Sequence, residues 1–154
     1  MSLDRTDKRL LDLLQRDAGQ TNLRLAEAVG LSPPACLKRV RALVDAGYIR
    51  RRVALLDPDR LGALLHIVVE VIMERDHKAL YQQFLARAVA HPAVKQCYRV
   101  TGEVDFVLIV VVPDMAAYDR FCDAVLYADA NMRKFRTLVS RFRDKFDTAL
   151  DIID

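Results

Sequence analysis

Hydrophobic residues follow two different periods along this chain. In roughly the first fifty residues they recur every three or four positions, as in Leu10, Leu11 and Leu14, which is typical of amphipathic helices. From residue 48 onward, segments appear in which apolar and polar residues alternate, a pattern that indicates strands. The two periods together predict a helical N-terminal part and an α+β C-terminal part.

Polar residues and glycines predict where the N-terminal helices begin and end. Asp4, Thr21 and Ser32 precede the three apolar runs, and their side chains can accept hydrogen bonds from the first turn of a helix. Gly19 and Gly30 follow the first two runs, where we expect the left-handed conformation that ends a helix. The short connection VGLS between the second and third helices is typical of a helix-turn-helix.

The third helix has two chemically different sides. It opens with Pro33, which suits the first helical position because the N–H that proline lacks has no partner there. Helical spacing predicts a buried face formed by Cys36, Val40, Leu43 and Gly47. The opposite, exposed side is predicted to carry Pro34, Lys38, Arg41 and Asp45, with Ala35 and Arg39 near its edges. A strand is expected next, over residues 48–55.

Positive charge is concentrated at this helix and the strand that follows it. The chain carries a net charge of only +3, yet the cations of residues 32–52 are opposed by the single anion Asp45. A helix that offers small and cationic residues has the dimensions of a major-groove reader. The candidate contacts to double-stranded DNA are Ser32, Pro34, Ala35, Lys38, Arg39, Arg41, Arg50, Arg51 and Arg52. The alternative is an ordinary solvated basic surface.

The C-terminal part alternates strands and helices in the order βαββαβ, a ferredoxin-like arrangement. Strands are expected over residues 65–74, 94–101, 106–112 and 136–146, and helices over residues 77–90 and 114–127. The predicted domains are residues 1–56 and 64–154, joined by a linker over residues 57–63.

The third strand, FVLIVVV, is apolar on both of its faces. Two helices can cover one face of a four-stranded sheet, so the other face needs a different cover. The same face of a second chain would provide it, which predicts a homodimer with two-fold symmetry. Such a dimer would present two third helices to DNA about 34 Å apart, or at a multiple of that spacing.

A glycine-containing acidic turn follows the second strand of this domain. Gly102 permits a tight turn with exposed N–H groups, and Glu103 and Asp105 supply carboxylates. N–H donors beside an anion would suit the carboxylate and ammonium groups of a free amino acid. An ordinary hairpin turn is the alternative, and it explains the same residues without a ligand.

Several motifs, in order, resemble those of the Lrp/AsnC family of bacterial and archaeal transcription regulators. The stretches are LDRTDKRLLDLLQRDAGQTN, LAEAVGLSPPACLKRVRALVDAGYI and ALLDP. They match the family's leading LDxxD, its GLS turn, its C-L-x-R-V-x-x-L recognition helix, its G-[YF]-I close and its ALL-[ND]-P strand. The likeness extends through the C-terminal half, and implies a winged helix-turn-helix followed by a RAM-type βαββαβ domain.

The resemblance also implies an amino-acid effector and a larger assembly. Family members pair through the C-terminal domain and often assemble four dimers into an octamer, with the effector pocket at contacts between dimers. The matching positions in this chain are Arg99, Thr101, Gly102, Glu103, Asp105, Met115, Thr137, Leu138 and Ser140. Arg99 stands where leucine-responsive members would carry an aliphatic residue. A cation there could clamp a carboxylate or shrink the pocket, which argues against leucine.

Composition and motifs argue against several other classes of protein. The charged N-terminus has no secretory signal, no apolar run is long enough for a membrane span, and the three cysteines form no CxxC pair, which predicts a cytoplasmic protein with reduced thiols and no metal or cofactor. No nucleophile elbow, phosphate loop or metal spacing is present, so we do not expect an enzyme. The rival to a sequence-specific regulator is a nucleoid-associated protein with low sequence preference.

Overall fold

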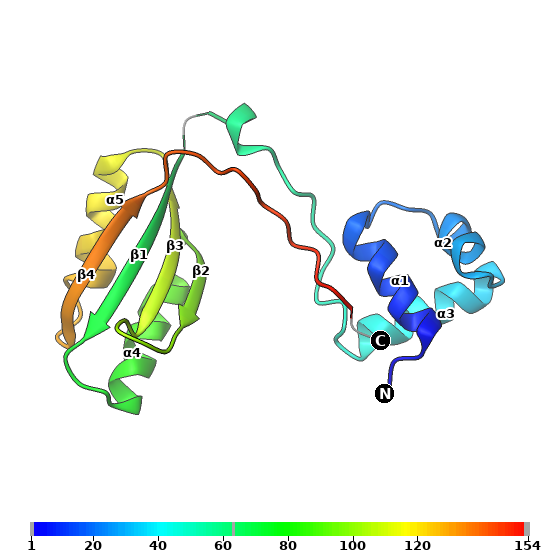
Figure 1. The fold of residues 1–154 in the computed structure, drawn as a ribbon, viewed down its shortest axis with the longest axis horizontal. Coiled ribbons are helices and arrows are strands. Elements are labelled where there is room, and N and C mark those ends of the chain that lie inside the picture. The colour runs from blue at the N-terminus through cyan, green and yellow to red at the C-terminus, as the bar shows by residue number, and fades with distance from the viewer. Residues whose placement is uncertain (1, 63, 153–154) are drawn as a thin grey trace. The chain divides into compact units, whose positions relative to one another are not determined.

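The computed structural model describes residues 2–62 and 64–152, which form two compact units (Figure 1). The first comprises the described residues up to Leu56 together with those from Lys145 onward. The second comprises the described residues from Asp57 to Asp144. Residues 145–152 therefore group with the N-terminal unit, although the strand that precedes them belongs to the second unit.

Three helices form the N-terminal unit: α1 (Arg5–Arg16), α2 (Asn22–Val29) and α3 (Pro33–Asp45). The three predicted caps are confirmed, since Asp4, Thr21 and Ser32 each accept a hydrogen bond from a backbone N–H of the following turn. Gly30 ends α2 with φ 68°, as predicted. The core between the helices consists of Leu10, Leu14, Leu25, Ala26, Cys36, Val40 and Leu43.

Two glycine predictions in this unit are wrong. Gly19 does not adopt the left-handed conformation, because α1 already ends at Arg16 and its end is closed by a hydrogen bond from the Asp17 N–H to the Leu13 carbonyl. Gly47 is exposed rather than buried, since α3 ends at Asp45 and Gly47 turns the chain with φ 79°.

The strand predicted over residues 48–55 is also absent from the structure. Residues 49–57 have neither helical nor strand structure, and residues 50–57 are exposed. A strand exists only where its N–H and C=O groups pair with a neighbour. No other segment of the described residues pairs with this one, so the alternating pattern has no ladder to join.

The second unit has the predicted βαββαβ order. Its strands are β1 (Leu65–Met73), β2 (Val94–Arg99), β3 (Phe106–Val112) and β4 (Met132–Val139). The helices are α4 (Lys78–Ala90) and α5 (Met115–Phe121), the latter continued by a π-helical turn over Cys122–Leu126. The strands form one antiparallel sheet in the order β2-β3-β1-β4.

The fourth strand begins and ends earlier than predicted. It pairs with β1 from Met132 to Val139, and a bond from the Ser140 N–H to the His66 carbonyl is the last one along this edge. Beyond it the chain leaves the sheet, and Phe142 is 76% exposed. The alternation of residues 141–146 resembles a strand, but β1 begins at Leu65 and offers no further partner.

Both helices cover the same face of the sheet (Figure 1). The face beneath them is fully buried in its centre, where Ile67, Val69, Val71, Phe106, Leu108 and Val110 have no exposed surface. The strand register places a second set of side chains on the opposite side, which we call the open face. It consists of His66, Val68, Glu70, Ile72, Gln96, Tyr98, Val107, Ile109, Val111, Lys134, Arg136 and Leu138.

The open face is mainly apolar with one charged pair at its middle. Val68, Val107, Ile109 and Val111 are half-buried by their neighbours on the sheet, and Leu138 is 50% exposed. Arg136 lies opposite Glu70 in the register, and its guanidinium lies 2.5 Å from the Glu70 carboxylate. Among the described residues of this unit, the helices leave this face uncovered (Figure 1).

Candidate functional site

Helix α3 presents the predicted cationic side to solvent. Ser32 caps it by accepting a hydrogen bond from the Ala35 N–H at 3.4 Å, and Pro33 and Pro34 occupy its first turn. Cys36, Val40 and Leu43 are buried against the other two helices, so the opposite side faces outward. Lys38 and Arg41 lie on that side, and within the described part of the chain neither forms an ion pair.

Arg39 has a different surrounding from the other two cations of α3. One of its guanidinium nitrogens lies 2.6 Å from a carboxylate oxygen of Asp4 and 2.8 Å from one of Asp7, on helix α1. Asp7 is buried, and Asp4 and Asp7 also close the capping box of α1. The N–H of Asp7 and the Arg39 guanidinium both lower the pKa of Asp4, while the two carboxylates raise the pKa of Arg39. This cation joins α3 to α1.

The remaining candidate DNA contacts lie at the start of α3 and in the segment that follows it. Pro34 is exposed and Ala35 is half-buried at the start of α3, while Arg50, Arg51 and Arg52 are exposed in the segment that follows it. A hydrogen bond missed by sequence analysis fixes the turn, since the Asn22 side chain donates to the Pro33 carbonyl at 2.8 Å. Asparagine at the first position of α2 is the only sequence signal for it.

The nine candidate effector residues are spread along the length of the sheet. In the antiparallel register, β1 ends at Met73 near the start of β3 at Phe106. Leu65 and Val112 therefore lie together at the far end of the sheet. At about 3.4 Å per residue, the seven residues of β3 separate these ends by roughly 20 Å. The first end holds a group of five, Arg99, Thr101, Gly102, Glu103 and Asp105. Met115 and Ser140 lie toward the far end, while Thr137 and Leu138 lie near the middle of the sheet, opposite Val69 and Val68 of β1.

Within the first group, Asp105 is engaged in the fold. Its carboxylate accepts a hydrogen bond from the Met73 N–H at 2.7 Å and another from the Tyr81 hydroxyl. Burial, reinforced by the Asp105 carboxylate, raises the pKa of Tyr81 to about 12. The Arg99 guanidinium lies 5.6 Å from the centre of the Tyr81 ring, within the range of a cation–π contact. Glu103, by contrast, is exposed.

The other four candidates do not share one face of the sheet. Thr137 lies on the helix-covered face, where its hydroxyl and that of Tyr118 are 2.6 Å apart. Leu138 lies on the open face and Ser140 just beyond the end of β4. Met115 opens α5 with 47% of its surface exposed. A single copy of the chain therefore does not bring the nine residues together around one ligand.

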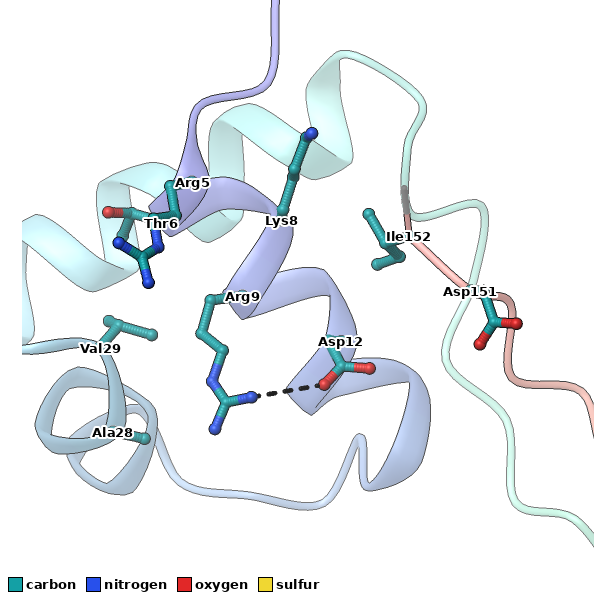
Figure 2. A pocket seen from close by; sticks show the side chains of 9 residues that line it. All are labelled: Arg5, Thr6, Lys8, Arg9, Asp12, Ala28, Val29, Asp151 and Ile152. Atoms are coloured by element: carbon teal, nitrogen blue, oxygen red, sulfur yellow. Dashed lines mark ion pairs between the residues drawn. The ribbon is translucent and has the colours of Figure 1, made fainter. Parts of the chain in front are cut away.

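A cleft that sequence analysis did not anticipate lies in the N-terminal unit (Figure 2). It has a volume of about 580 Å³ and runs along α1, from the end of α2 to residues 145–152, which we call the C-terminal tail. Cationic side chains of α1 form much of its lining, and Arg9 is paired with Asp12 at 3.6 Å. The full lining is Arg5, Thr6, Lys8, Arg9, Asp12, Ala28, Val29, Asp151 and Ile152.

Comparison with known families matches both halves of this arrangement. Residues 3–50 match the family described as winged helix-turn-helix DNA-binding, and residues 66–146 match the Lrp/AsnC ligand binding domain. The chain belongs to the Lrp/AsnC family. The leucine-responsive regulatory protein of Salmonella typhimurium is 37% identical to this Lrp/AsnC protein over 137 residues, which cover 89% of this chain and 84% of the relative. That of Escherichia coli K12 is 36% identical over the same length.

Solved structures of other Lrp/AsnC proteins have the same fold. An AsnC family transcriptional regulator from Agrobacterium tumefaciens superimposes with a TM-score of 0.87 at 34% identity, covering 96% of each chain. A transcriptional regulator from Neisseria meningitidis, solved in complex with L-methionine, gives a TM-score of 0.87 at 33% identity, covering 97% of this chain and 96% of that chain. The predicted fold class and the predicted family are thus confirmed, and this Lrp/AsnC protein is a DNA-binding transcriptional regulator.

This Lrp/AsnC protein has free thiols, and its described residues show neither a metal-binding group nor a helix that could span a membrane. Cys36, Cys97 and Cys122 are free, and burial raises the pKa of each thiol. Within residues 2–62 and 64–152, no group of three His, Cys, Asp or Glu side chains is arranged to hold a metal ion. No helix in the same residues has the length and apolar character needed to cross a bilayer.

The two neighbouring arginines of α3 allow a matched test of their roles. We expect Arg39→Ala to lower the free energy of unfolding of the three-helix unit, because it leaves the buried Asp7 carboxylate without its cation. Arg41→Ala should change that free energy by less than about 0.5 kcal/mol, as exposed substitutions do. Amide hydrogen exchange in α1 and α3 of the full chain measures both. Equal exchange in the two variants would contradict the role given to Arg39.

A second pair of variants compares a residue of the acidic turn that is bonded within the fold with one that is exposed. Asp105→Ala removes the acceptor for the Met73 N–H and the Tyr81 hydroxyl, so we expect it to destabilise the sheet unit by about 1–3 kcal/mol. Glu103→Gln alters an exposed side chain and should stay within about 0.5 kcal/mol of wild type. Urea denaturation followed by circular dichroism gives both values, and a stable Asp105→Ala protein would refute the structural role.

Proposed function

We propose that this regulator binds paired DNA half-sites as a homodimer and that a free amino acid, bound between copies of the chain, controls it. The observation that carries the proposal is the outward side of α3, where Lys38 and Arg41 stand opposite a fully packed apolar side. An α-helix fits the major groove, and unpaired cations on its outer side can contact phosphates or guanines without breaking internal bonds.

The candidate DNA contacts take different roles in this proposal. The side of α3 that faces the duplex carries Lys38 and Arg41 together with the small residues Pro34 and Ala35. Ser32 caps α3 and so directs the start of the helix toward the DNA backbone. Arg39 acts by positioning α3 against α1. The exposed run from Arg50 to Arg52 supplies phosphate contacts, which add affinity without sequence preference.

The open face supports the homodimer. Its half-buried valines and isoleucines form an apolar surface of the kind that marks an interface in soluble proteins. A two-fold axis through this face would cover it with an identical surface. The Glu70–Arg136 pair then lies inside the interface, where it loses hydration unless polar groups of the second copy lie opposite it. The pair therefore favours one alignment of the two sheets.

The effector site is proposed to form between dimers. Because the nine candidate residues are spread along the sheet and over both of its faces, a complete pocket requires two copies to meet, as they would in an octamer of four dimers. Glu103, with the N–H groups around Gly102, would receive the amino group and carboxylate of the ligand. Asp105 acts by holding the turn. The methionine complex of the Neisseria relative makes L-methionine the first compound to test.

A low-specificity nucleoid protein is the second candidate function. The three exposed arginines at positions 50–52 favour it, since binding to phosphate is independent of sequence. The two functions differ in the ratio of specific to non-specific affinity at fixed salt. A regulator should exceed roughly 10³, whereas a packing protein should not.

The DNA-binding proposal is tested on the DNA upstream of the protein's own gene. We expect Lys38→Ala and Arg41→Ala to weaken binding and to reduce the salt slope by about one for each phosphate that is no longer neutralised. Arg120→Ala, an exposed cation on α5, is the matched control and should bind like wild type. Gel-shift assays across all twenty amino acids test the effector. Equal affinity and equal oligomer size with every amino acid would overturn effector control.

The dimer is tested by placing a charge on the open face. Ile109→Glu should convert the dimer to a folded monomer, because the new carboxylate would lose its hydration in the interface. Ala86→Glu places the same charge on the exposed surface of α4 and should leave the dimer intact. Sedimentation velocity gives the mass and circular dichroism the fold. A dimeric Ile109→Glu protein would place the interface elsewhere.

A further inference from the structure

A side chain of helix α1 holds the C-terminal tail through two hydrogen bonds to the main chain of the tail. The Gln15 side chain donates to the Leu150 carbonyl at 2.8 Å and accepts from the Leu150 N–H at 2.8 Å. A carboxamide has the same donor and acceptor as a peptide group, so Gln15 pairs with Leu150 much as a neighbouring strand would. The pairing fixes the direction and position of the tail along α1.

Gln15 is prepared for this pairing by its own helix. Its amide also donates to the Asp12 carboxylate at 3.2 Å, and that carboxylate is held at 3.1 Å by Arg16. The chain Arg16–Asp12–Gln15 orients the carboxamide toward the tail, with one amide hydrogen for Asp12 and the other for Leu150. Arranging the side chain in advance reduces the entropy that docking costs.

The tail is recognised through its backbone more than through the side chain of Leu150. That side chain is 74% exposed, whereas Ile152 is half-buried beside the cleft along α1. Figure 2 shows Ile152 lying between the tail and α1, with Asp151 directed away from the helix. Charge also favours docking, since the Asp147 carboxylate interacts electrostatically with Arg16 of α1.

The same tail is continuous with the last strand of the sheet. Ser140 is bonded to β1 through the His66 carbonyl, and Leu150 is bonded to α1, which leaves residues 141–149 between the two anchors. A fully extended segment of this length spans at most about 30 Å. The sheet unit and the three-helix unit are therefore joined twice, once through the residues before β1 and once through the docked tail.

We propose that the α1 surface around Gln15 is a docking site for the chain's own C-terminal tail, and that the docked tail limits the orientations available to the DNA-binding helices. A head tethered twice samples fewer orientations than a head tethered once. Simultaneous binding of both heads to two half-sites then costs less entropy, which raises the affinity for paired sites and leaves single sites unchanged. This second part rests on the proposed DNA-binding function.

The first experiment tests the docking itself. Gln15→Met removes both hydrogen bonds at similar volume, and Leu150→Pro removes the donated N–H. We expect trypsin to release the peptide that begins at Phe146 faster from both variants, by roughly fivefold, as loss of a net hydrogen bond would give. Gln82→Met, on the exposed side of α4, and Leu150→Ala, which keeps the main chain, are the controls and should match wild type. Equal release from all five proteins would overturn the docking site.

The second experiment tests its consequence for DNA. Affinities of the same proteins are measured for one duplex with two half-sites and for another with one. We expect Gln15→Met and Leu150→Pro to lose several-fold in affinity for the paired duplex only, while both controls keep the wild-type ratio. If the variants release the tail but keep the wild-type ratio of the two affinities, the tail does not restrain the DNA-binding helices. Absence of DNA binding by wild type would instead refute the proposed function, while the trypsin assay still decides the docking site.

Discussion

The covering of the sheet on one face only is the constraint on which the proposed mode of action depends. Strand β3 is apolar along its whole length, and α4 and α5 bury just one side of it. At about 25 cal/mol for each Å² of apolar surface removed from water, covering the other side favours association strongly. A two-fold dimer through that face also supplies two copies of α3, and paired helices are what a DNA site with two half-sites requires.

Charged residues near the candidate sites divide into those that hold the fold and those that are available to a ligand. Arg39 and Asp105 both lay within the predicted sites, yet each is bonded to a residue far away in the sequence, Arg39 to Asp7 and Asp105 to Tyr81. Lys38, Arg41 and Glu103 are exposed neighbours of these residues. Helical or hairpin spacing gives the side on which a residue lies, but an ion pair depends on which other element packs against that side.

Features that depend on hydrogen bonds within one turn were therefore easier to predict from the sequence than features that depend on pairing between distant segments. The caps at Asp4, Thr21 and Ser32 follow from hydrogen bonds within one turn, and the sequence identified all three. Strand formation needs a partner that the sequence does not show. The alternating residues 48–55 find none in the described chain, and β4 stops once β1 has no residue left to pair. The spread of the candidate effector residues along the sheet and over both of its faces likewise emerges only from the register.

The end of β4 connects the proposed effector site with the tail. Leu138 and Ser140, two of the effector candidates, lie on and just beyond the last part of β4, and the chain continues from them to the tail that docks on α1. A ligand can alter DNA binding only by interacting differently with two states of the protein. A ligand that favours one position of residues 138–140 would also favour one position of the tail anchor. The coupling would then need no path through the linker before β1, because the tail itself joins the candidate effector residues of β4 to the DNA-binding helices.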